Sequence, residues 1–294
     1  MTDFHGLPVR AIGNDHLRLE CLAESGPRLV RLFLAGSTDN VLAETPDVQW
    51  PTPWGKYSLR GGHRLAIAPE ALGVSYAPDD DGVTVEELSD GVRLLGPLES
   101  PAGVSKTIEI HLHPDRPALT LRHVLQNQRV EAVSIAPWAV TQLPTGGSAV
   151  LPLRHAPERC REAPDRQVVL WPYASWRDER LVIDDEYARI DARPSSAELK
   201  IGALTPGWLG YLDRGVFFLK RFDPQLDQPH PDLNTNAQVY CHDRCVELES
   251  LAPLMRLEPG QISAHLETWE IYRAGDAPIS SDGLRAWLPG LQLV

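Results

Sequence analysis

Strand patterns separated by turns run through the first half of the chain and constrain the fold more than any other feature. From residue 76 onward the segments are GVTVEELS, GVRLLGPLE, VSKTIEIHLHP and ALTLRHVLQNQ, with turns at residues 79–82, 89–91 and 113–115. Turns about every ten residues are typical of an antiparallel sandwich or barrel. No run of ten or more residues has a clean helical period, which predicts an all-β fold with helix in under about a tenth of the residues.

Composition is consistent with that fold. The chain has 294 residues, of which 43% are hydrophobic, and it contains 26 prolines and 22 glycines. Such a chain can bury a substantial core, and the prolines and glycines suit many short elements joined by turns. We expect one large β-sandwich domain spanning residues 1–294.

The net charge, the lengths of the apolar runs and the N-terminal residues argue against several functions. A net charge of −12 argues against nucleic acid as a partner, because such proteins gather Lys and Arg against the phosphates. No apolar run approaches the ~20 residues needed to cross a bilayer. The start, MTDFHGLPVRAIG, lacks the basic and apolar regions of a signal peptide. These features predict a cytoplasmic protein that does not bind membranes.

Cysteine and glycine motifs give no sign of a metal or cofactor. The four cysteines are scattered, and free thiols are the default in a cytoplasmic chain. Cys241, His242 and Cys245 lack a second pair of ligands at zinc-like spacing. There is no P-loop and no dinucleotide fingerprint. We therefore expect neither a bound metal nor a cofactor.

Two carboxylates mark the stretch from residue 239 to residue 272, which reads as two strands and a turn at 258–260. Glu247 and Glu249 are two residues apart on the first strand, so alternation places both on one face. Neither can be buried cheaply without a partner. Either that face is wet, or it lines a polar cleft.

Aromatic residues concentrate on two segments that we predict to be irregular. Residues 45–58 contain three closely spaced prolines and carry Trp50 and Trp54, and residues 160–178 carry Trp171 and Trp176. Exposed aromatics on irregular segments often stack on the apolar faces of sugar rings. The alternative is that they fold back over the core.

Cations form the densest polar cluster of the first half in LRGGHRLAIAPE, residues 59–70. Arg60, His63 and Arg64 can all bind oxygen there, although an arginine could instead pair with a carboxylate across the sheet. A predicted hairpin at residues 207–222 turns at residues 213–215. Its second strand must place either Lys220 or Arg221 on an inner face, where a cation needs a partner.

Three segments together resemble one known superfamily. LRGGHRLAIAPE, APWAVTQL and VELESLAPLMRLEPGQISAHLETWEIY are similar to the galactose mutarotase-like (aldose 1-epimerase-like) proteins, and within them to a bacterial branch with a GGHRL–APE segment. The resemblance implies a twisted two-sheet supersandwich over nearly the whole chain. It also implies a sugar site in the concave sheet.

The resemblance implies roles for individual residues. The family's glutamate base falls at Glu249, with Glu247 as the alternative, and its early arginine falls at Arg64. The strand that carries the family's histidine acid, VSIAPWAVTQL, has no histidine here, and we expect His63 to supply the acid from another direction. The remaining residues that we expect to bind the sugar are Arg60, Glu247, Trp138, Lys220, Trp54 and Trp171.

These features favour an aldose 1-epimerase-like enzyme that moves protons on a small carbohydrate. A non-catalytic carbohydrate-binding protein is the main alternative, since aromatics, Arg and Glu suffice to bind sugar hydroxyls. A glycoside hydrolase or lyase with two working carboxylates also remains open. For an enzyme we expect one glutamate to have its pKa lifted by desolvation and the other to pair with a cation.

Overall fold

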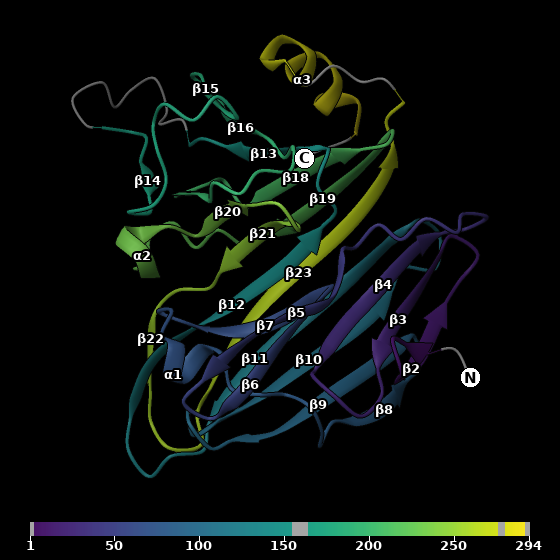
Figure 1. Cartoon of the computed structure of the whole chain (residues 1–294), viewed down its shortest axis with the longest axis vertical. Coiled ribbons are helices and arrows are strands. Elements are labelled where there is room, and N and C mark those ends of the chain that lie inside the picture. The colour runs from purple at the N-terminus through teal and green to yellow at the C-terminus, as the bar shows by residue number, and fades with distance from the viewer. Residues whose placement is uncertain (1–2, 155–163, 276–279, 292–294) are drawn as a thin grey trace.

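Two large antiparallel sheets face each other in the computed structural model, which describes residues 3–154, 164–275 and 280–291 (Figure 1). Strand accounts for 54% of the structure and helix for 6%. The all-β sandwich expected from the turn spacing is therefore confirmed.

The first sheet carries the segments that the sequence singled out. Its strands, in spatial order, are β1 (Asp3–Phe4), β2 (Leu7–Gly13), β3 (Leu17–Leu22), β4 (Arg28–Leu34), β7 (His63–Ala68), β12 (Val133–Leu143), β21 (Val246–Leu251), β20 (Ala237–Cys241), β17 (Leu199–Ala203) and β14 (Val168–Leu170), with β22 (Met255–Leu257) paired to β12. The stretch from residue 239 to residue 272 thus forms parts of four strands rather than two.

The second sheet packs against the inner face of the first. Its order is β15 (Leu181–Ile183), β16 (Tyr187–Asp191), β13 (Ser148–Pro152), β18 (Trp208–Asp213), β19 (Val216–Phe222), β23 (Ile262–Arg273), β11 (Ala118–Asn127), β10 (Val104–Leu112), β9 (Gly91–Glu99) and β8 (Thr84–Leu88). The predicted hairpin with its turn at residues 213–215 is confirmed as β18–β19.

Helices are few and short. They are α1 (Leu72–Ser75), α2 (Pro231–Asn234) and α3 (Ser281–Trp287), followed by a 3-10 turn (Leu288–Leu291). The Ser280 side chain caps α3 by accepting a hydrogen bond from the Gly283 N–H at 3.0 Å. In Figure 1, α3 lies near β13, β18 and β19, at the opposite end of the molecule from the N-terminal strands. Among the described residues, no helix has the length and apolar character of a membrane span.

Residues 45–58 are regular structure, contrary to the prediction of an irregular loop. They lie in a two-stranded sheet of β5 (Glu44–Thr52) and β6 (Gly55–Gly61). The prolines are tolerated because this small sheet has only edge strands, which do not need every N–H for pairing. Pro46 lies within the register shift between Thr45 and Gln49, and Pro53 lies in the turn.

Alternation along the strands separates a core face from an outer face. Between the sheets, Leu65, Leu143 and Leu248 of the first sheet belong to one buried cluster with Leu121 and Ile271 of the second. The outer face of β7, β12, β21, β20 and β17 carries the side chains of opposite parity. That outer face holds the site described next.

Candidate functional site

A cleft of about 550 Å³ lies on the outer face of the first sheet, partly walled by β5, β6 and α1. Its size is ordinary for a small-molecule site. It contains five aromatic and six ionisable side chains among its lining residues, which are Val48, Trp50, Leu59, Arg64, Glu70, Leu72, Tyr76, Trp138, Tyr173, Glu198, Lys200, Tyr240, His242 and Glu247.

Strand register brings the polar side chains of this face together. Arg64 is paired with Val140 on β12, and Val140 is paired with Glu249 on β21. One step along, Gln142 is paired with Glu247, and the row continues to β20 and β17. Side chains of directly paired residues point to the same side of a sheet. The predicted common face of Glu247 and Glu249 follows from this register.

Glu247 reaches the cleft and is held by two donors. Its Oε1 accepts from Gln142 Nε2 at 2.7 Å, and Arg64 Nη1 lies 3.4 Å from the same oxygen. Burial lowers the pKa of Arg64, but the nearby Tyr57 hydroxyl and the Glu247 carboxylate outweigh it, so the guanidinium stays charged. This pair offers a hydrogen-bond donor and an acceptor on the cleft wall.

Glu249 lies beneath the cleft wall and has no exposed surface. Its Oε2 accepts from Trp138 Nε1 at 2.7 Å and from Lys200 Nζ at 2.9 Å. Its Oε1 is buried and has no hydrogen-bond partner among the residues that the structure describes. Burial raises the pKa of Glu249 to about 7, with Lys200 opposing that rise and Glu247 adding to it. A carboxylate with such a pKa suits general-base chemistry near neutral pH.

We expected a cation beside the glutamate that is not the base, and Glu247 has one, but Glu249 pairs with a cation as well. Glu247 pairs with Arg64 and Glu249 pairs with Lys200. The two carboxylates differ instead in access and in pKa. Glu247 faces the cleft, whereas Glu249 has the raised pKa and lies one side chain behind the wall.

Lys200 is a site residue that sequence reasoning missed. It lies on β17, lines the cleft, and has its ammonium 4.9 Å from the Trp138 ring centre and 4.8 Å from that of Trp171. Two such rings stabilise a cation. The pairing of β17 with β20, and of β20 with β21, places Lys200 beside Glu249, and no local pattern in the sequence indicates that pairing.

His63 and Lys220 lie between the sheets, which corrects their predicted roles at the sugar. His63 neighbours Arg64 on β7, so its side chain points to the opposite face, where Nε2 lies 2.7 Å from His123 Nε2. Lys220 is fully buried and pairs with Glu267 at 2.8 Å. Lys220 is therefore the inner-face cation predicted for this strand, and Glu267 is its partner.

Arg60 and Trp54 also lie outside the cleft lining. Arg60 forms ion pairs with Asp79 and Asp80, in line with the alternative that an arginine of this segment pairs with a carboxylate. The Trp54 side chain is 55% exposed and donates from Nε1 to the Gly73 carbonyl at 2.8 Å. Of the predicted sugar-binding residues, Arg64, Glu247 and Trp138 line the cleft, whereas Trp171 is not in the lining and contacts the lining residue Lys200.

Hydrogen bonds fix the tautomers in the interior cluster. His123 Nδ1 lies 3.1 Å from the His265 carbonyl, which can only accept, so Nδ1 donates and Nε2 is an acceptor. His63 Nε2 therefore donates to His123, and its Nδ1 accepts from the Thr141 hydroxyl at 2.9 Å. Both imidazoles are neutral in this arrangement.

The same cluster contains a candidate metal set, because atoms of His63, His123 and Glu267 lie within 4.8 Å of one another. The donor types suit zinc. However, Glu267 already accepts from Ser250 Oγ and from Trp269 Nε1 at 2.9 Å, and the Lys220 ammonium lies against it. Hydrogen bonding accounts for this arrangement without an ion.

We expect this cluster to make stability fall in acid. The pKa values of His63 and His123 are lowered by burial, and that of His265 is lowered to about 3. As pH falls below about 6.5, the unfolded chain takes up protons that the native chain cannot, which favours unfolding. Glu249, with its raised pKa, opposes this by binding one proton in the native state.

With three histidines against one glutamate, the free energy of unfolding should be level above about pH 7 and should fall by more than about 1.4 kcal/mol per pH unit near pH 5. Urea titrations at several pH values measure this. His265→Gln should flatten the slope, because it removes one of the three buried imidazoles. A slope near zero in the parent would contradict the assignment.

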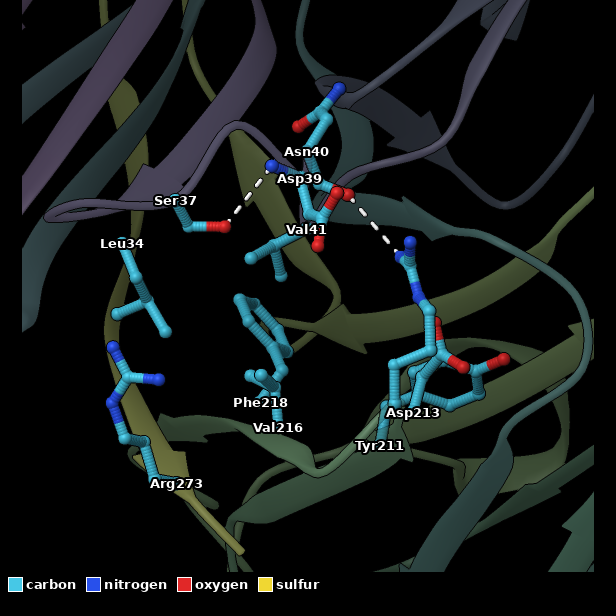
Figure 2. Close-up of a pocket in the computed structure, with 11 residues that line it drawn as sticks. Leu34, Ser37, Asp39, Asn40, Val41, Tyr211, Asp213, Val216, Phe218 and Arg273 are labelled. Atoms are coloured by element: carbon cyan, nitrogen blue, oxygen red, sulfur yellow. Dashed lines mark hydrogen bonds and ion pairs between the residues drawn. The ribbon is translucent and has the colours of Figure 1, made fainter. Parts of the chain in front are cut away.

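A second cavity lies where the loop after β4 meets the β18–β19 hairpin, and Figure 2 shows its lining. It holds about 150 Å³, with Leu34, Val41 and Phe218 on its apolar side. Asp39 is exposed there, and Asp213 is occupied by Arg214 at 2.8 Å. The cavity is smaller than the cleft and has no buried carboxylate, so the cleft is the better candidate for chemistry.

Solved structures with the same architecture are identified by comparison. A proposed aldose 1-epimerase from Klebsiella pneumoniae subsp. pneumoniae MGH 78578 matches with a TM-score of 0.58 at 11% identity, over 98% of this chain and 83% of its own. A galactose mutarotase-like protein from Lactobacillus casei ATCC 334 matches with a TM-score of 0.53 at 10% identity, over 90% of this chain and all of its own.

A third match is a TPR-domain containing protein from Parabacteroides distasonis ATCC 8503. Its TM-score is 0.62 at 14% identity, over 93% of this chain but only 48% of that longer one. No protein-family model and no curated protein matches the sequence. At these identities the structural matches speak for fold alone. The chain has the galactose mutarotase-like β-sandwich fold, as the three sequence segments had indicated.

Proposed function

We propose that the cleft binds a small sugar and interconverts its anomers, with Glu249 as the general base of an aldose 1-epimerase-like reaction. The observation that carries this proposal is the buried Glu249 carboxylate, whose pKa is raised to about 7 directly behind the cleft wall. Trp138 and Lys200, which hold its Oε2, both line the cleft. A base with a pKa near the working pH is the most effective kind.

The remaining lining supports a carbohydrate as the ligand. Trp50, Tyr76 and Tyr173 offer flat apolar surfaces to the faces of a sugar ring. Arg64 and Glu247 provide a donor and an acceptor for hydroxyl groups. Both cations that line the cleft, Arg64 and Lys200, are already paired with glutamates, so the site favours a neutral sugar over an anionic one.

A binding protein without catalysis is the second candidate, and two observations favour it. Glu249 has no exposed surface, so its carboxylate must be uncovered before it can touch a sugar. The central strand β12 supplies no histidine to act as an acid. Under this reading, Arg64, Glu247 and the aromatics would suffice to hold the ligand.

A sugar-library screen by thermal shift, followed by NMR anomer exchange on each hit, tests the proposal. We expect at least one neutral aldose to raise the melting temperature and to exchange its anomers faster with the protein than without it. The Arg64→Met variant should weaken binding of that sugar. If a sugar binds, Arg64→Met abolishes the binding, and the parent does not accelerate exchange, the binding-protein function is correct instead.

One prediction separates the aromatic residues that the sequence grouped together. Trp50 lines the cleft, where its ring lies 5.4 Å from that of Tyr76, whereas Trp54 lies outside the lining. Trp50→Ala should therefore raise the dissociation constant of the sugar about five- to tenfold, the loss of one stacking contact. Trp54→Ala should bind like the parent. Isothermal titration measures both, and a parental dissociation constant for Trp50→Ala would show that Trp50 makes no contact with the ligand.

A further inference from the structure

Ring opening of a sugar needs an acid as well as a base. The Lys200 ammonium lines the cleft and contacts Glu249, the proposed base. We propose that Lys200 is the acid partner of Glu249, so that the two side chains work as one acid–base pair at the cleft wall. This inference rests on the proposed function. It assigns to Lys200 the role for which the sequence had suggested His63.

Contacts of the ammonium carry the proposal. Within the described part of the chain, Lys200 Nζ has one hydrogen-bond partner, Glu249 Oε2 at 2.9 Å. An ammonium has three N–H donors, so two remain for a ligand. The rings of Trp138 and Trp171, 4.9 and 4.8 Å away, hold the ammonium in place. The Lys200 side chain also lines the cleft, so a bound sugar can touch it directly.

The reaction balances with these two groups alone. Glu249 takes the proton from the anomeric hydroxyl, and the electrons of that O–H bond form the C1=O1 double bond. The C1–O5 bond breaks with its electron pair moving to the ring oxygen, which receives a proton from the Lys200 ammonium. Rotation about C1–C2 and the reverse steps then close the ring as the other anomer and restore both groups.

Charge conservation makes this pair suitable for a buried site. Before the step the pair is a carboxylate and an ammonium, and after it a carboxylic acid and an amine, so its total charge stays zero. A buried ion pair has given up much of its solvation, which brings the neutral pair close in free energy. The charged and titratable groups that face Glu249 are Lys200, Glu247, Glu70, Arg64 and Tyr173 on the cleft side, and Lys220 across the sheet.

The two oxygens of Glu249 differ in their contacts. Oε2 accepts from Trp138 and Lys200, whereas Oε1 is buried with no hydrogen-bond partner among the described residues and has lone pairs to accept a hydroxyl proton. Lysine has a long flexible stem, so the Lys200 ammonium can turn toward the ring oxygen of a sugar bound in the cleft.

Two variants at Lys200 distinguish the effect of its proton donation from the effect of its positive charge. Lys200→Met removes both, whereas Lys200→Arg keeps the charge but cannot give up a proton at neutral pH. With D-glucose and D-galactose as probes, we expect NMR anomer exchange to fall at least about a hundredfold in both variants, the low end for loss of an acid–base group. Lys106→Met is the matched control, because the buried Lys106 pairs with Glu99 at 2.7 Å outside the cleft, and it should retain parental exchange.

A second readout does not depend on turnover. The Trp138 indole N–H donates to Glu249, so its ¹H–¹⁵N resonance should report the titration of that carboxyl group. We expect a midpoint near 7 in the parent, at least about one pH unit higher in Lys200→Met, and near the parental value in Lys200→Arg.

Parental exchange in Lys200→Arg would show that only charge matters and would overturn the acid role. An unchanged indole midpoint in Lys200→Met would show that Lys200 and Glu249 do not act as a pair, and would overturn the inference even if no sugar were turned over. If the parent exchanges neither probe nor any screened sugar, the proposed function fails, and the indole titration alone decides whether the pair exists.

Discussion

Replacing Glu249 by Gln is expected to cut anomer exchange at least a hundredfold while leaving sugar binding within several-fold of the parent. Glutamine keeps the shape of the side chain and can still accept from Trp138 Nε1, but it cannot take a proton. Loss of a general base costs about a hundred- to ten-thousand-fold in rate. NMR exchange rates, together with dissociation constants from titration calorimetry, measure the two effects separately.

Glu99→Gln is the matched control for that variant. Glu99 is largely buried, pairs with a lysine, has an oxygen without a hydrogen-bond partner in the described part of the chain, and has a pKa raised by burial, yet it lies outside the cleft. It should lose some stability and no exchange activity. The alternative base, Glu247, is tested by Glu247→Gln. If Glu249→Gln exchanges like the parent and Glu247→Gln does not, the two glutamates have been assigned the wrong way round.

The second large effect concerns stability rather than chemistry. Lys220→Met should lower the free energy of unfolding by about 3–5 kcal/mol, because it leaves the Glu267 carboxylate buried without its cation. It also removes the donor that the Ala139 and Leu248 carbonyls share, at 2.8 and 3.1 Å. Urea denaturation followed by fluorescence measures the loss.

Two controls show whether burial is the cause. Arg285→Met breaks an ion pair with Glu186 that is largely exposed, and it should change the free energy of unfolding far less than Lys220→Met does. Replacing both Lys220 and Glu267, by Met and Leu, removes the buried charges together and should be less destabilising than Lys220→Met alone. A loss below about 1 kcal/mol for Lys220→Met would contradict the importance of this pair.

Local patterns in the sequence predicted the strands because alternation and turns are local signals. The common face of Glu247 and Glu249, the β18–β19 hairpin and the need of an inner-face cation for a partner all follow from residues close together in the chain. Alternation also separates His63 from Arg64, since neighbouring residues on a strand point to opposite faces. That signal was present in the sequence, and it argues against placing both side chains at one sugar.

Those local patterns could not predict which distant strands pair with one another. Lys200 meets Glu249 only because β17, β20 and β21 are neighbours in the sheet, and the two residues are 49 positions apart in the chain. The contact between His63 and His123 was equally unpredictable, because it depends on how the two sheets pack together. The hairpin of β5 and β6 was missed for another reason, because prolines that would break a central strand are harmless at an edge.

Anomer exchange by the parent protein at two pH values tests the central claim most directly. A neutral sugar found by the thermal-shift screen is mixed with the protein, and its exchange is measured by NMR at pH 6 and pH 8 against protein-free buffer. Because Glu249 must be ionised to act and has a pKa of about 7, the protein-dependent rate should rise about tenfold between these pH values. A sugar that binds in the cleft, yet whose anomers exchange at the buffer rate at both pH values, would contradict the claim.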